Sequence, residues 1–140
     1  MRCVLDTNVF VSGLLLPLSA PRRAIDLARE RGSILLSSEL LLELSDVLSR
    51  DRFRRYVDSD VVRRFLFSLA RESTWIEVTT RVEACRDPKD DKFLSLAISG
   101  HATRIVTGDL DLLSMHPFRG IDIVNPRTFV DQAKRQDVHE

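Results

Sequence analysis

Several acidic residues stand where a buried segment of the chain is expected to begin or end. Asp6 directly follows the apolar run Cys3–Leu5. A carboxylate at that depth must be hydrogen-bonded, paired or bound to a cation, because a bare charge in a low-dielectric site is costly or takes up a proton. Asp109 follows another apolar run, and the pair Asp90 and Asp91 precedes that run. What these acids could do depends on whether the fold brings them together.

A further acid, Glu43, lies inside a predicted helix. Ser37 or Ser38 can begin this helix, and apolar residues then recur with helical spacing. Glu43 falls beside Leu40 and Val47, at the border of the apolar stripe. An exposed glutamate would more naturally lie on the opposite face, although Glu43 considered alone is equally consistent with an ordinary surface residue.

The elements that must position these acids follow from hydrophobic patterning. Short apolar runs predict four strands and a weaker fifth: Arg2–Asp6, Ser33–Ser37, Arg104–Thr107, Ile121–Val124 and, more weakly, Trp75–Val78. Segments with helical spacing separate them. Pro21 and Gly32 bracket the first long helix, and Gly100 ends a later one.

This alternation predicts an α/β fold, a three-layer α/β/α sandwich with a central, mostly parallel sheet. We expect the first strand in the interior of the sheet and helices on both faces. At 140 residues the chain has the length of one domain. We assign that domain to residues 1–133 and expect a polar C-terminal tail at 134–140 that frays.

Composition narrows the class of protein. The chain is 44% hydrophobic and 30% charged, with no apolar run near the ~20 residues of a membrane span and no basic-then-apolar leader, so we expect a cytoplasmic protein without membrane association. Cys3 and Cys85 are expected to be reduced thiols.

The formal net charge is zero, yet arginines cluster, notably between Arg50 and Arg55. They could contact phosphate there or form ordinary ion pairs on a helix face.

In open α/β sheets, ligands bind outside the carboxyl ends of the strands. Asp6, Asp109 and the Asp90–Asp91 pair map to that edge, and Glu43 points toward it. Hard oxygen ligands without histidine or thiolate suit Mg²⁺ or Mn²⁺, and a carboxylate cluster that no lysine neutralises needs such an ion. A site of this kind activates water for in-line displacement at phosphorus.

Four motifs together resemble a known family: "VLDTNVFVSGLL", "SSELLLEL", "DPKDDKFLSLAISGHATRIVTGDLDLL" and "GIDIVNPRTFV". They look like a PIN-domain protein of the kind that forms the toxin half of VapBC-type toxin–antitoxin pairs. The resemblance implies a metal-dependent ribonuclease that uses Mg²⁺ or Mn²⁺ and is held inactive by a cognate antitoxin. Carried over position by position, it assigns the four catalytic, metal-binding acids to Asp6, Glu43, Asp91 and Asp109, with Asn8 and Thr107 as supporting polar residues.

Some assignments stay open at this stage. Asp90 could replace Asp91, although the spacing to Asp109 favours Asp91. Asp111 is either an additional ligand or a helix cap. We also expect a homodimer, because the segments "FVSGLLLPLSA" and "RRFLFSLA" carry much apolar surface. His101 and the other two histidines are expected to be bystanders.

Rival functions are weaker. A haloacid-dehalogenase-like phosphatase requires a second aspartate two positions after the first, where this chain has Asn8. A phosphoacceptor receiver domain needs a lysine on a late strand, and a dinucleotide binder needs a glycine-rich loop after the first strand. Neither feature is present in the sequence. A non-catalytic PIN-like scaffold that binds RNA or protein remains the main alternative.

Overall fold

The computed structural model describes residues 1–139, with side chains described through residue 136. The elements run in the order β1 (Arg2–Leu5), α1 (Thr7–Leu15), α2 (Ala20–Arg31), β2 (Ser33–Leu36), α3 (Ser38–Leu48), α4 (Asp51–Arg54), α5 (Ser59–Glu72), β3 (Thr74–Trp75), a 3₁₀ turn η1 (Pro88–Asp90), α6 (Asp91–Ser99), β4 (Arg104–Val106), α7 (Leu110–Leu113), β5 (Asp122–Val124) and α8 (Pro126–His139).

The strands form one parallel sheet in the order β3-β2-β1-β4-β5. The first strand is central, and its residues from Cys3 to Leu5 are fully buried because helices cover both faces. The chain builds outward from β1 to β2 and β3, then returns to the other side of β1 with β4. The boundary between β1 and β4 is therefore a topological switch point, where the connections diverge and leave a crevice.

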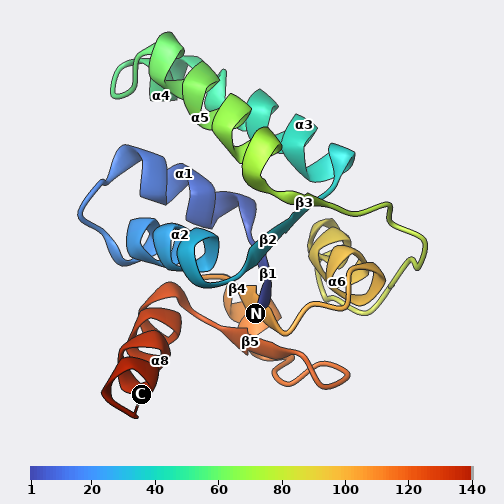
Figure 1. The fold of residues 1–140 in the computed structure, drawn as a ribbon. Helices are drawn as coiled ribbons and strands as arrows, with labels where there is room; N and C mark the ends of the chain where they lie inside the picture. Colours follow the sequence, from blue (N-terminus) through green and yellow to red (C-terminus); the bar gives the residue numbers. More distant parts are fainter. Residues whose placement is uncertain (140) are drawn as a thin grey trace.

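Helices lie on both sides of the sheet, as Figure 1 shows: α1, α2 and α8 on one side and α6 on the other. Helices α3 and α5 pack on each other beyond the β2–β3 edge. Gly13 allows α1 to approach α2 closely, because a Cβ there would lie 2.5 Å from Ile25 Cδ1. The expected three-layer fold with a central parallel sheet is confirmed.

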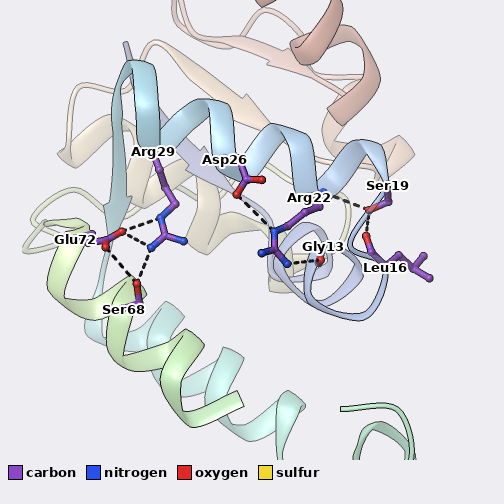
Figure 2. A network of polar contacts seen from close by, with 8 residues as sticks. All are labelled: Gly13, Leu16, Ser19, Arg22, Asp26, Arg29, Ser68 and Glu72. Carbon is purple, nitrogen blue, oxygen red and sulfur yellow. Dashed lines mark hydrogen bonds and ion pairs between the residues drawn. The ribbon is translucent and has the colours of Figure 1, made fainter. Parts of the chain in front are cut away.

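A polar network ties α2 to α5 (Figure 2). The Arg29 guanidinium forms an ion pair with Glu72 and donates to Ser68 Oγ at 2.7 Å. Near the start of α2, Arg22 pairs with Asp26, and its backbone N–H is capped by the Ser19 hydroxyl. The Arg29 contacts tie α5, which packs on the Glu43-bearing helix α3, to α2.

The structure refines several sequence expectations. Four strands form where the strong apolar runs predicted them, and the weak fifth is shorter and earlier, at Thr74–Trp75. Cys3 and Cys85 are free. The expected boundary at residues 133 and 134 falls inside α8, which continues to His139, while residue 140 lies outside the described residues. Among the helices described, none is long and apolar enough to cross a membrane.

Candidate active site

The switch point brings the ends of β1 and β4 together through one threonine. Asp6 is 4% exposed and caps α1, accepting a hydrogen bond from the Asn8 backbone N–H at 3.1 Å. Thr107, fully buried, donates its hydroxyl to Asp6 Oδ2 at 2.7 Å and accepts from the Asp109 backbone N–H at 3.0 Å. Thr107 thereby fixes both the Asp6 carboxylate and the backbone of Asp109.

Asp109 is the cap of α7. Its Oδ1 accepts from the backbone N–H groups of Asp111 at 2.8 Å and Leu112 at 3.4 Å, which orients the carboxylate at the strand end. Asp111 lies in the first turn of α7 and is not among the residues that line the cleft described below. The interpretation of Asp111 as the helix cap is wrong, because Asp109 caps α7 and Asp111 only donates its backbone N–H to that cap. Its role as an additional metal ligand stays a prediction.

The structure places Asp90, and not Asp91, beside these two acids. Asp90 is 8% exposed, lines the same cleft as Asp6 and Asp109, and its Oδ2 is buried without a hydrogen-bond partner among the described residues. Asp91 turns away: its Oδ1 accepts from the backbone N–H groups of Ala84 at 3.0 Å and Cys85 at 2.7 Å. Of the two aspartates that the sequence left open, the structure thus places Asp90 on the cleft, and which of them binds metal stays a prediction.

The local backbone explains this reversal. The 3₁₀ turn η1 precedes α6, so Asp90 is already helical, with φ −85° and ψ −15°, one residue before the α-helix begins. The next residue, Asp91, is rotated by about 100° around the axis. Asp90 consequently faces the strand ends while Asp91 holds the preceding loop.

Glu43 reaches the cleft from the middle of α3, as expected from its position at the border of that helix's apolar face. Its carboxylate forms an ion pair with Lys92 of α6, with Nζ 2.5 Å from Oε2. Both side chains are partly buried, 32% exposed for Glu43 and 21% for Lys92. The expectation that no lysine neutralises the acids is therefore wrong for Glu43. Sequence reasoning missed that Lys92 pairs with it.

The acids line a cleft of about 250 Å³ with a cationic rim. The lining residues are Asp6, Thr7, Asn8, Glu43, Val47, Arg50, Arg52, Asp87, Lys89, Asp90, Lys92, Phe93 and Asp109. The acids, called the floor below, come from the ends of β1 and β4, from α3 and from the turn before α6. The basic side chains, called the rim below, come from Arg50 and Arg52 around the start of α4 and from Lys89 and Lys92 around the start of α6. Such a cleft accepts a polyanion only if a cation offsets the floor.

The electrostatics of the floor reflect like charges held close together. Burial raises the pKa of Asp6, opposed by its hydrogen bonds with Thr107 and Asn8, with further upward contributions from Asp109 and Glu43. Burial, followed by repulsion from Asp109 and Asp6, raises the pKa of Asp90 to about 6. In contrast, the backbone N–H groups of Cys85 and Ala84 lower the pKa of Asp91.

The donor chemistry fits a hard divalent cation. The cluster offers carboxylate oxygens and no histidine or thiolate on the cleft wall, and the buried, unpartnered Oδ2 of Asp90 is an acceptor without a donor. Within the described residues, however, no three acidic, histidine or cysteine side chains are already arranged to hold an ion. The oxygens suit Mg²⁺ or Mn²⁺, but at least one side chain has to move for them to converge.

Fold and site together define an α/β/α protein with a carboxylate cluster at the switch point of a five-stranded parallel sheet. The chain belongs to the PIN domain family, whose model matches residues 2–111. PIN domains are generally nucleases. Over 117 residues the chain is 32% identical to the uncharacterized protein MJ1680 of Methanocaldococcus jannaschii, which covers 82% of this chain and 75% of that protein.

Solved structures share the fold. A chain in the crystal structure of VapBC2 from Rickettsia felis bound to a DNA fragment from their promoter superposes with a TM-score of 0.61 and 17% identity, covering 89% of this chain and 98% of that one. PAE2754 from Pyrobaculum aerophilum gives a TM-score of 0.64 and 18% identity, over 97% and 91% of the two chains. At these identities the likeness concerns the fold alone.

Proposed function

We propose that this protein is a metal-dependent endoribonuclease, the cytoplasmic toxin of a toxin–antitoxin module. One observation carries the proposal: a cleft at the switch point is lined by Asp6, Glu43, Asp90 and Asp109 together with the basic side chains of the rim. Membership of the PIN family supports nuclease activity. The alternative of a haloacid-dehalogenase-like phosphatase loses its basis with that membership.

The hydrogen bonds that hold each acid suggest its role in metal binding. Asp6 and Asp109, oriented through Thr107, would form the rigid part of a site for Mg²⁺ or Mn²⁺. Asp90 would contribute its unpartnered oxygen, and Glu43 the fourth carboxylate. These residues would hold a cation that supplies an activated water and offsets phosphate charge. In-line attack of that water oxygen on phosphorus would break the bond to the 3′-oxygen, leaving a 3′-hydroxyl and a 5′-phosphate.

The rim supports a phosphate polymer as the substrate. Arg50, Arg52 and Lys89 line the cleft beside the acids, and their charges would hold the backbone on either side of the scissile phosphate. Arg50 also pairs with Asp46 at 3.3 Å, an exposed contact that a phosphate can replace at little cost. The RNA sequence that is cut depends on groove shape and is left unassigned.

We further propose a cognate antitoxin partner and a homodimer. Part of the apolar segment between α1 and α2 is exposed, with Leu16 at 59% and Leu18 at 96%, and Phe67 on α5 is 67% exposed. Other members of both segments are buried in the core, including Phe10, Leu14 and Leu69. The VapBC2 neighbour supports a partner of this type. Sedimentation of the protein alone and with a co-encoded neighbouring protein tests both assemblies.

Cleavage of total cellular RNA tests the proposed activity. The wild-type protein should cut in Mg²⁺ or Mn²⁺, stop in EDTA and recover when the cation is restored, whereas the Asp6→Asn variant should be inactive under every condition. Arg81→Met, which removes an exposed ion pair with Glu39 in the first turn of α3, is the matched control and should cut normally. Activity that survives chelation, or full activity of Asp6→Asn, would refute the mechanism.

A non-catalytic RNA- or protein-binding scaffold is the second candidate. The ion pair between Lys92 and Glu43 favours it, because a lysine already neutralises one acid of the cluster. Calorimetric titration with Mn²⁺ separates the two, since a scaffold that had lost its chemistry would bind the cation no better than the Asp6→Asn variant does.

A further inference from the structure

The ion pair between Glu43 and Lys92 is the least expected feature of the cleft. It joins α3, which follows β2, to α6, which precedes β4, and so spans the two sides of the cleft. Glu43 Oε2 is buried, and the ion pair is its sole contact of hydrogen-bonding length within the described chain. This oxygen therefore has no second donor to which it could turn if the lysine were removed.

The pair occupies an oxygen for which a divalent cation would compete. Mg²⁺ binds oxygen at about 2.0 to 2.1 Å and excludes other positive groups from the same lone pair. An ammonium nitrogen 2.5 Å from Oε2 occupies that position. Coulomb repulsion between Lys92 and a divalent ion at the same carboxylate adds to the exclusion, because the partly buried site screens charge less well than water does.

The arrangement of the remaining acids agrees with this reading. Asp6 and Asp109 are held through Thr107, and Asp90 presents an unpartnered oxygen, yet no three potential ligands in the described part of the chain are assembled to hold an ion. Among the four acids in the described residues, Glu43 is the one whose carboxylate pairs with a basic side chain, that of Lys92. Asp6, Asp109 and Asp90 are thus free of a competing cation in the described structure, while Glu43 is paired with one.

We propose that Lys92 is the resident counter-ion of Glu43 in the metal-free protein and a positioning residue that sets metal affinity: a divalent cation gains the Oε2 atom of Glu43 only by displacing Lys92. The inference rests on the proposed function, because it presumes that the cluster binds Mg²⁺ or Mn²⁺. Released from Glu43, the Lys92 ammonium lies in the cleft beside the rest of the cationic rim, where a phosphate of the substrate can take the place of the carboxylate.

Calorimetric titration with Mn²⁺, without RNA, tests the competition. Lys92→Met should bind Mn²⁺ about tenfold more tightly than the wild type, because the ion no longer displaces a positive group. Lys89→Met is the matched control: it removes the same charge from the same cleft, and within the described residues Lys89 forms no ion pair with Glu43. Its affinity should change by less than about threefold.

A double-mutant cycle makes the test specific to the pair. In a Glu43→Gln background, Lys92→Met should change Mn²⁺ affinity no more than Lys89→Met does, since the carboxylate for which Lys92 competes is gone. Thermal unfolding gives a second readout. Lys92→Met should unfold at a lower temperature than the wild type in EDTA and should be stabilised more by Mn²⁺.

Each outcome decides a definite point. Unchanged or weaker Mn²⁺ binding by Lys92→Met, or an equal gain in the Glu43→Gln background, would overturn the role of Lys92 while leaving the proposed nuclease intact. Failure of the wild type to bind Mn²⁺ at all would overturn the proposed function, and the inference with it. Tighter binding that depends on Glu43 supports both.

Discussion

Replacing Asp90 by asparagine should stabilise the metal-free protein at neutral pH. Burial and the neighbouring Asp109 and Asp6 raise the pKa of Asp90 from 3.8 to about 6. At about 1.4 kcal/mol per unit, keeping this carboxylate ionised in the folded state costs up to about 3 kcal/mol at pH 7. The cleft is open to solvent, so screening reduces the expected gain to roughly half of that value.

The pH dependence has a definite sign. An acid whose pKa is higher in the folded state binds protons more tightly there, so its contribution to stability is fully present below the unfolded pKa and is lost as the pH rises through the folded value. For Asp90 this window runs from 3.8 to about 6. The gain from Asp90→Asn should therefore be complete near pH 7 and should vanish near pH ~4.

Chemical unfolding in EDTA at these two pH values measures the effect, and Mn²⁺ titration measures its functional counterpart. Asp90→Asn should weaken Mn²⁺ binding by more than about tenfold, as expected when a ligand is removed. Asp91→Asn is the matched control, because its amide oxygen can still accept from the Ala84 and Cys85 N–H groups, and it should bind Mn²⁺ normally. If Asp91→Asn lost the cation and Asp90→Asn kept it, the assignment of Asp90 to the cluster would be wrong.

Three further changes test the site. Thr107→Val removes the hydrogen bonds to Asp6 and from Asp109 and should destabilise the protein by about 1 to 3 kcal/mol in urea unfolding, so a smaller loss would contradict its bridging role. Asp6→Asn should abolish RNA cleavage while stability holds or rises, because repulsion within the cluster is relieved; a large loss of stability would count against this. Arg52→Ala, in the inactive Asp6→Asn background, should weaken RNA binding and reduce its salt slope by about one, and an unchanged slope would exclude a phosphate contact.

The fold was predictable because the patterns that carry it are local. Buried parallel strands read as continuous apolar runs, so β1 and β4 stand out in sequence. The two-residue β3 lies at the edge of the sheet and ends at Trp75, which is 47% exposed. So short and exposed a strand leaves little hydrophobic signal, which is why its predicted position was displaced.

The strand-end acids were equally predictable, and Asp6 and Asp109 lie together because parallel strands end at one edge of the sheet. The choice between Asp90 and Asp91 was not. It depends on the 3₁₀ turn before α6 and on whether the loop at Ala84 and Cys85 offers its N–H groups to a carboxylate. Sequence spacing contains no information on that loop, since its residues have neither helical nor strand periodicity.

Lys92 was missed for a related reason, because its partner Glu43 lies 49 positions earlier on another helix and is reached only through the packing of α3 and α6 around the sheet. The same geometry divides the site into two halves with different mechanical properties. Thr107 joins the Asp6 carboxylate to the backbone N–H of Asp109 at the ends of two adjacent buried strands, so these two residues cannot separate without disturbing the core. Glu43 and Lys92 are partly exposed side chains on different helices, joined by a contact that rotamer changes can break. Adjustment to a cation should therefore occur on the α3–α6 side of the cleft, while the strand ends keep their geometry.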